Sequence, residues 1–237
     1  MLAEVATVRE TQPRVGTRKL QVHLAHAGLP VGRDRLFTLL RTAGVLVPRK
    51  RRGTFTTYSK HGYVVAPNHL KDAVITAPGQ AVVSDITYLR VRWEAFAYLF
   101  LVTDVYSRRI VGWHLSRDLS HHRALLALQQ AIATVGDVEG LLHHSDRGTQ
   151  YCCHAYQHAL AAARILPSMT DANHCYQNAI AERVNGILKD EFHLDAVFPS
   201  FLDAHHAVAH AIDCYNTVRL HGSLQMQTPA QVFSRAA

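Results

Sequence analysis

The first fifty residues carry apolar positions at helical spacing. The pattern predicts one helix over about 17–27, started by Thr17 and ended by Gly28, and a second helix over about 32–43. Two short helices joined by a tight turn are typical of a helix-turn-helix-like module. The apolar positions expected to form its small core are Leu20, Leu24, Leu36, Phe37, Leu39 and Leu40.

From residue 81 onward the pattern changes to short runs of β-branched and aromatic residues. Three such runs follow one another with short breaks, which indicates an antiparallel meander, and later runs alternate with helical segments, which indicates crossover connections. The sequence therefore predicts an α/β fold with a mixed five-stranded sheet flanked by helices. The expected strands cover 81–89, 96–105, 109–116, 141–145 and 165–169, and the expected helices cover 120–135, 154–164, 178 onward and 200–217.

Positive charge is concentrated at the start of the chain. The net charge is +7, and residues 1–60 hold twelve Lys and Arg against three Asp and Glu, whereas residues 61–237 hold thirteen against fifteen. Such a basic segment is typical of a nucleic-acid-binding protein, because each neutralised phosphate releases a counterion; a merely solvated charged face is the alternative. The side chains expected to meet DNA are Arg18, Lys19, Arg33, Arg35, Arg41, Arg49, Lys50, Arg51 and Arg52.

Pattern and charge together divide the chain into four parts. A helix-turn-helix-like DNA-binding module is expected over 1–48, followed by a basic linker over 49–78. The α/β core is expected over 79–195, and a C-terminal helix and tail over 196–237 are expected to complete it.

Nothing in the sequence indicates a membrane protein. The longest apolar run, 95–102, has eight residues, whereas a membrane span needs about 18–20. The N-terminus also lacks the basic-then-apolar pattern of a secretory signal. We therefore expect a soluble, cytoplasmic protein.

Acidic residues occupy three positions that call for an explanation. Asp85 lies inside the first expected strand, where an acid is costly to bury, and Asp146 directly follows the fourth. If these two strands are neighbours, the aspartates meet at one edge of the sheet. Glu182 lies near the start of the helix from 178, on a polar row separate from its apolar stripe. The members of this row are Asn178, Glu182, Asn185 and Lys189.

Three further residues near these acids carry alternatives. Asn178 and Lys189 are candidate DNA contacts, with a helix cap and a solvated lysine as the ordinary alternatives. Asp104, at the end of the second expected strand, belongs either to the outer part of the site or to an ion pair with Arg108 or Arg109.

Three converging carboxylates repel one another unless a cation compensates their charge. Mg²⁺, or Mn²⁺ in its place, takes oxygen ligands and is commonly held by one or two carboxylates together with substrate phosphates. Two such ions suit phosphodiester chemistry, so Asp85, Asp146 and Glu182 are predicted to be both catalytic and metal-binding. A zinc module built from the four cysteines and seventeen histidines is the rival, but adjacent histidines point apart and chelate poorly.

The spacing of the carboxylates resembles that of a known family. Sixty residues (86–145) separate the first acid from the second and thirty-five (147–181) separate the second from the third, which is similar to the D, D, thirty-five, E signature of retroviral integrases and related transposases. The surrounding motifs resemble the second-frame protein, OrfB, of insertion-sequence family three. They are Asp85-Ile86-Thr87-Tyr88, His144-Ser145-Asp146-Arg147-Gly148, Asn178-Ala179-Ile180-Ala181-Glu182, Tyr215-Asn216 and Thr228-Pro229-Ala230.

This resemblance implies an RNase H-like core and a DNA transposase that nicks the ends of its element and transfers the freed 3′-hydroxyl to a second phosphodiester. The implied partners are the terminal inverted repeats, target DNA, further copies of the chain assembled on DNA, and a first-frame protein, either separate or joined by a frameshift fusion. Association with the nucleoid is also implied. The alternative function is a DNA-binding protein that retains the fold without catalysis.

Overall fold

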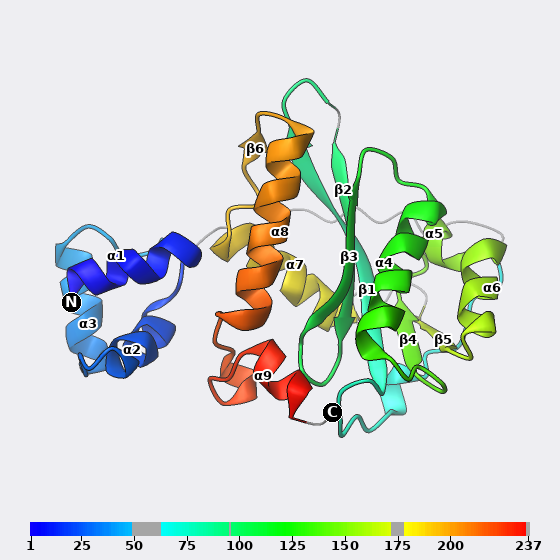
Figure 1. The fold of residues 1–237 in the computed structure, drawn as a ribbon, viewed down its shortest axis with the longest axis horizontal. Helices are drawn as coiled ribbons and strands as arrows, with labels where there is room; N and C mark the ends of the chain where they lie inside the picture. Colours follow the sequence, from blue (N-terminus) through cyan, green and yellow to red (C-terminus); the bar gives the residue numbers. More distant parts are fainter. Residues whose placement is uncertain (49–62, 95, 172–177, 236–237) are drawn as a thin grey trace.

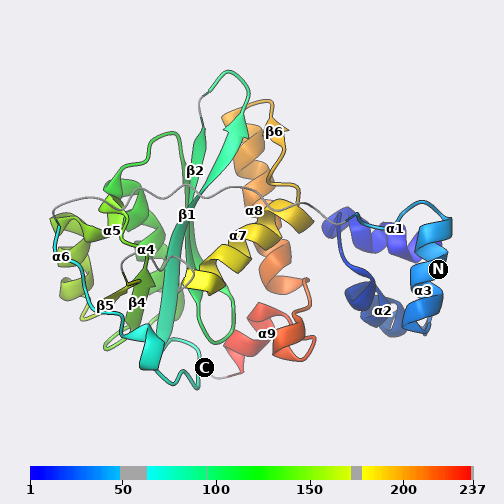
Figure 2. The same ribbon diagram turned by 180° about the vertical axis from the view of Figure 1, so that it is seen from behind.

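The computed structural model describes residues 1–48, 63–94, 96–171 and 178–235. Three N-terminal helices form a small module beside a larger body that is built on one sheet (Figure 1). The view from behind shows the same separation between module and body (Figure 2). Across the described residues, no helix combines the length and the apolar character needed to cross a membrane.

The N-terminal module consists of α1 (Leu2–Thr11), α2 (Thr17–His26) and α3 (Arg33–Thr42). The predicted helix pair is confirmed as α2 and α3. The first helix was not predicted because it buries a single side chain, Val5, and so shows little apolar periodicity. The buried core of the module is Val5, Val15, Leu20, Leu24, Leu36 and Leu40.

Two residues expected in this core lie elsewhere. The prediction for Phe37 is wrong, because its side chain is 42% exposed and the guanidinium of Arg41 lies over its ring. Leu39 is only half-buried. Val5 and Val15 pack with Leu36 and Leu40 instead, so the buried face of α3 is narrower than the apolar pattern indicated.

The body contains the predicted mixed sheet. Its strands lie in the order β3-β2-β1-β4-β5, with β1, β2 and β3 antiparallel and β4 and β5 parallel to β1. A sixth strand of two residues, β6 (Val197–Phe198), pairs with the far end of β1 and was not predicted, because two residues carry no periodicity. The five predicted strands are β1 (Ala81–Val91), β2 (Ala97–Asp104), β3 (Ile110–Ser116), β4 (Leu142–Ser145) and β5 (Leu166–Met169).

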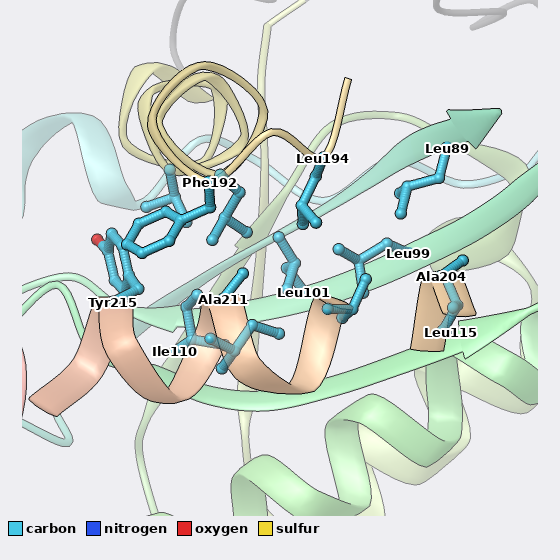
Figure 3. Close-up of a cluster of buried hydrophobic side chains, with 14 of the residues drawn as sticks. Leu89, Leu99, Leu101, Ile110, Leu115, Phe192, Leu194, Ala204, Ala211 and Tyr215 are labelled. Carbon is cyan, nitrogen blue, oxygen red and sulfur yellow. The ribbon is translucent and has the colours of Figure 1, made fainter. Parts of the chain in front are cut away.

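Helices cover both faces of the sheet (Figures 1 and 2). One face packs against α4 (His121–Val135), α5 (Thr149–Cys152) and α6 (His154–Ala162), and the other against α7 (Ala179–Glu191) and α8 (Phe201–Thr217). Alternation along β2 explains both cores, because Phe100 and Val102 face the first group while Leu99 and Leu101 face the second. Figure 3 shows the second core, with Leu99 and Leu101 between the sheet and α8.

Helix α4 approaches the sheet unusually closely at one glycine of β3. A Cβ on Gly112 would lie 2.8 Å from the backbone nitrogen of Ala131 and nearer still to the carbonyl oxygen of Ala127. Only a residue without a side chain fits there. The contact fixes α4 against the face of β3.

The C-terminal part of the chain packs on the body. Helix α8 buries Val208, Ile212 and Tyr215 against the sheet. A short helix that was not predicted, α9 (Pro229–Ser234), follows with a capping box at Thr228.

The region predicted as a basic linker divides into two. Arg49, Lys50, Arg51 and Arg52 lie outside the described residues. Residues 63–78 are described, and they lie along the body rather than forming a free linker. The backbone nitrogen of His69 donates to Oγ of Ser168 at 2.9 Å, and that of Met169 donates to the carbonyl oxygen of Pro67.

Candidate active site

Parallel pairing places the two predicted aspartates side by side. Strands β1 and β4 pair in a register that sets Ser84 opposite Ser145. Asp85 and Asp146 are the next residues of the two chains. Since neighbouring strands lie about 4.8 Å apart, both carboxylates belong to one edge of the sheet, where β4 ends.

Asp85 is half-buried and is oriented by two hydrogen bonds. Its Oδ1 accepts from the backbone nitrogen of Ile86 at 2.9 Å, and its Oδ2 accepts from the side-chain amide of Asn185 at 2.7 Å. Burial raises the pKa of this carboxyl to about 7, and the negative charges of Asp146 and, more weakly, Glu182 contribute to the rise. Burial and the neighbouring carboxylates therefore both disfavour the charged form of Asp85.

The turn after β4 holds Asp146. Its Oδ1 accepts a hydrogen bond of 2.9 Å from the backbone nitrogen of Gly148. A Cβ at Gly148 would lie 3.0 Å from that same oxygen, so a side chain there would press on the carboxylate. The guanidinium of Arg147 donates to the carbonyl oxygen of Thr170 at 2.7 Å and ties the turn to the residue after β5.

Glu182 lies on helix α7, which packs against β1. It lies in the first turn of the helix and is exposed. Asn185, which bonds Asp85, follows it by three residues and therefore lies on the same side of the helix. The pKa of Asp85 responds to the charge of Glu182, which indicates that the two carboxylates interact electrostatically.

Asn178 anchors the beginning of α7 to the sheet. Its side-chain amide donates to the carbonyl oxygen of Ser84 at 3.0 Å, and the residue is 3% exposed. The sequence placed Asn178 among the candidate DNA contacts. The structure places it in the interior instead, where it positions the helix that carries Glu182 relative to the strand that carries Asp85.

The three predicted carboxylates interact electrostatically, but they do not form a closed metal site. Among the residues that the structure describes, no three carboxylate, imidazole or thiol side chains come together closely enough to hold one metal ion. Asp85 and Asp146 form a pair, and Glu182 on α7 interacts electrostatically with Asp85. Carboxylate oxygens are the ligands that Mg²⁺ and Mn²⁺ prefer, and two such residues with substrate phosphates are a usual donor set for Mg²⁺. The donor chemistry therefore fits these ions.

A buried histidine supports the two strands that carry the aspartates. His143 on β4 is 1% exposed, and its Nε2 is hydrogen-bonded to Oγ of Ser84 at 2.8 Å and to the hydroxyl of Tyr156 at 2.9 Å. Burial, with a smaller contribution from His144, lowers the pKa of His143 to about 3, so its ring is neutral. This role was not predicted; the signal for it in the sequence is the pair of histidines inside the expected strand 141–145.

Most of the described basic side chains of the N-terminal module that were predicted to meet DNA are exposed, and one is not. Arg18, Arg33, Arg35 and Arg41 are exposed on the N-terminal module, as expected. Arg33 pairs with its neighbour Asp34 at 2.9 Å, on the surface.

The prediction that Lys19 lies on the outer face is wrong. Its ammonium pairs with Glu191 of α7 at 2.8 Å, and only 15% of its side chain is exposed. Arg219 binds the same carboxylate from the other side, with a shortest distance of 2.7 Å. Lys19 therefore joins the N-terminal module to the body. Lys189, on α7, is half-buried.

Asp104 follows neither of its two predicted alternatives. The residue is fully buried, and its carboxylate accepts hydrogen bonds from the backbone and hydroxyl of Ser107 and from the backbone nitrogen of Gly79. It stabilises the turn between β2 and β3.

Comparison with known families identifies the body. The sequence matches the integrase core domain family over residues 75–175, and a second integrase core domain family over residues 163–229. The two matches together cover β1 through α8, including all three predicted carboxylates.

Solved structures show the same fold. The chain is similar to the integrase catalytic core domain of HTLV-2 in complex with magnesium, with a TM-score of 0.54 and 19% identity, over 66% of this chain and 97% of that one. It is also similar to a chain of the simian T-cell lymphotropic virus intasome, with a TM-score of 0.55 and 18% identity, over 96% of this chain and 73% of that one. The predicted RNase H-like α/β fold is thereby confirmed.

Sequence relatives extend the match to the whole chain. A 31 kDa protein of insertion element IS600 from Shigella sonnei is 36% identical over 96% of this chain and 84% of its own length. Transposase InsF of insertion sequence IS3A from Escherichia coli K12 is 31% identical over 96% of this chain and 79% of its own length. A putative transposase of element IS986/IS6110 from Mycobacterium tuberculosis is 33% identical over 87% of this chain and 76% of its own length. The chain therefore belongs to the family-three insertion-sequence transposases and is a DNA transposase with an integrase core.

Proposed function

We propose that this transposase nicks DNA at the terminal inverted repeats of its element and transfers the freed 3′-hydroxyl to a phosphodiester of target DNA. In this proposal Asp85, Asp146 and Glu182 are the catalytic residues and hold two divalent cations. The observation that carries it is the register of β1 and β4, which sets Asp85 beside Asp146. The raised pKa of Asp85 supports it, because a cation would relieve the charge that the neighbouring carboxylates add.

The chemistry that bound Mg²⁺ or Mn²⁺ supplies is activation of the attacking oxygen and neutralisation of the leaving one. The chain contributes the geometry. Asn185 orients the carboxylate of Asp85, Gly148 admits that of Asp146, and Asn178 fixes the start of α7, the helix that carries Glu182. Lys189, two turns beyond Glu182, is proposed to contact the DNA backbone.

The division of the chain is part of the same proposal. Residues 1–48 are the DNA-binding module, in which Arg18, Arg33, Arg35 and Arg41 are exposed. The catalytic core is proposed to begin at about residue 63, because 63–78 packs on the body, and 196–237 completes it. Arg49, Lys50, Arg51 and Arg52 are proposed as further DNA contacts.

The proposed reaction also requires an assembly of several molecules. Two element ends must be held together for joining, so several copies of the chain are expected on DNA. A first-frame protein, either separate or joined by a frameshift fusion, is proposed as the second partner, and the nucleoid as the place of action.

The test is a nicking assay with purified protein and labelled duplex that carries an element end, in Mg²⁺ or Mn²⁺. Asp85→Asn, Asp146→Asn and Glu182→Gln are each expected to abolish nicking while DNA binding persists. Glu139→Gln is the matched control, because Glu139 is exposed and forms only a surface pair with Arg164.

Two outcomes would contradict the proposal. Equal nicking by the wild-type protein and Glu182→Gln would remove Glu182 from the mechanism. Binding without nicking by the wild-type protein, with either metal, would favour the alternative of an inactive DNA-binding protein.

A further inference from the structure

A basic cavity lies on the side of α7 that faces α2 and the segment after α8. Its volume is about 510 Å³. Its wall contains apolar side chains of α7, among them Ile180 and Ile187, and the ring of Tyr215. Four cationic side chains from four separate segments also line it: Lys19, Arg108, Arg183 and Arg219.

Positive charge in this cavity exceeds the negative charge beside it. No acidic residue is among the described residues that line it. Glu191, just outside, binds both Lys19 and Arg219, so one carboxylate is shared by two cations. Burial, followed by the charge of Arg219, lowers the pKa of Lys19 to about 8, although the contacts with Glu191 raise it. Arg108 and Arg183 add two more positive charges.

A buried histidine in the same wall lacks a hydrogen-bond partner. His221 is 6% exposed, and its ring packs edge-on against Tyr215 with centroids 4.9 Å apart. Its Nε2 is buried and makes no hydrogen bond within the described parts of the chain. An unpaired buried nitrogen is unfavourable, because it has lost its hydrogen bonds to water. Such a group in the wall of a cavity indicates a place for a polar ligand.

The cavity is next to the proposed catalytic centre. Arg183 lines it and directly follows Glu182, and both residues are exposed in the first turns of α7. Successive residues of a helix are about 1.5 Å apart along its axis and point about 100° apart. A DNA strand that reaches Glu182 therefore lies close to Arg183, which is the next residue of the same turn. The anion available at this position is the phosphodiester backbone of that strand.

We propose that this cavity binds a backbone phosphate of the DNA strand that enters the active site, with Arg183 as the main contact and His221 as a hydrogen-bonding partner. The inference rests on the proposed function. Arg183 supplies a guanidinium whose fork of N–H groups matches phosphate oxygens. Lys19 and Arg219, already held by Glu191, contribute to the positive field, so the N-terminal module forms part of the phosphate site.

The test measures DNA binding separately from catalysis. Fluorescence anisotropy with a labelled duplex carrying the element end is recorded without divalent cations over a series of KCl concentrations. Arg183→Gln is expected to weaken binding severalfold and to make the slope of log affinity against log salt shallower by about 1, as for loss of one phosphate contact. His221→Phe keeps an aromatic ring but removes its nitrogen atoms. It is expected to weaken binding while the slope of log affinity against log salt stays unchanged.

The matched control is Arg164→Gln, because Arg164 is 72% exposed in its side chain and lies outside the cavity. This control is expected to bind as the wild type does. Unchanged affinity and slope in Arg183→Gln, or losses of equal size in Arg183→Gln and Arg164→Gln, would overturn the proposal. Thermal unfolding of each variant verifies that it folds. Failure of the proposed function is separate, since it would show as nicking by Glu182→Gln.

Discussion

The side-chain amide of Asn185 donates a hydrogen bond of 2.7 Å to Oδ2 of Asp85. This bond joins α7 to β1 and fixes one oxygen of a carboxylate whose pKa is raised. Asn185→Ala is expected to lower nicking about 10–100-fold, the usual effect of removing a group that orients a metal ligand. The loss should appear mainly as a higher Mg²⁺ requirement, measured by titrating the metal at saturating DNA.

Gln129→Ala is the control for Asn185→Ala, because it removes an amide from an exposed position of α4. Its activity should match the wild type at every metal concentration. A wild-type metal requirement in Asn185→Ala would show that Asp85 needs no help from α7.

Gly112 should tolerate no side chain. Gly112→Ala places a methyl group against the backbone of α4 at Ala127 and Ala131, and overpacking of this kind costs about 1–3 kcal/mol. The free energy of unfolding in urea measures the loss. Gly186→Ala is the opposite case, since a Cβ there meets nothing and alanine favours the helix by about 1 kcal/mol. Equal effects of the two substitutions would contradict the close approach of α4.

Glu191 should be a larger contributor to stability than a surface acid. Burial raises its pKa, but Arg219 and Lys19 more than offset that effect and leave the pKa below its ordinary value. Glu191→Gln leaves two largely buried cations, Lys19 and Arg219, without their negative partner. A loss of about 3 kcal/mol in unfolding free energy is therefore expected. Glu94→Gln, which breaks the exposed pair with Arg117, should cost less than about 1 kcal/mol. Comparable losses would show that the cluster contributes little.

Acid should destabilise the protein through His143. Its pKa is near 3 when folded, so the unfolded chain takes up the proton first as the pH falls below about 6.5. The stabilising contribution is complete above that pH and decreases below it, by about 2 kcal/mol at pH 5. Unfolding in urea at two pH values measures the loss. In His143→Gln the difference between the two pH values should be smaller by that amount; an unchanged difference would contradict a buried neutral ring.

Much of the fold could be predicted because its strands have strong local signals. The alternation along β1 and β2 determines which side chains face α4 and which face α7, so the sheet and its neighbours follow from pattern alone. The polar row on α7 was equally readable. Its member Asn185 donates a hydrogen bond to Asp85 itself.

Other features depend on contacts between distant parts of the chain. Lys19 faces inward because Glu191, 172 residues later, lies opposite it, and no local pattern encodes that pairing. Asn178 is buried because α7 begins directly over Ser84. Phe37 is exposed because Val5 and Val15 occupy the core that it was expected to fill. In each case tertiary packing overrides the local preference of the residue.

The parallel register of β1 and β4 makes the length of these strands as important for the site as their composition. Side chains alternate between faces with a period of two, so an insertion or deletion of one residue within β1 ahead of Asp85 would turn that carboxylate toward α4. Asp146 would then stand alone at the edge. A substitution in either strand alters one side chain, whereas such a change of length would reverse the facing of every residue after it. Gains and losses of residues during evolution are therefore expected in the loops and not in these two strands.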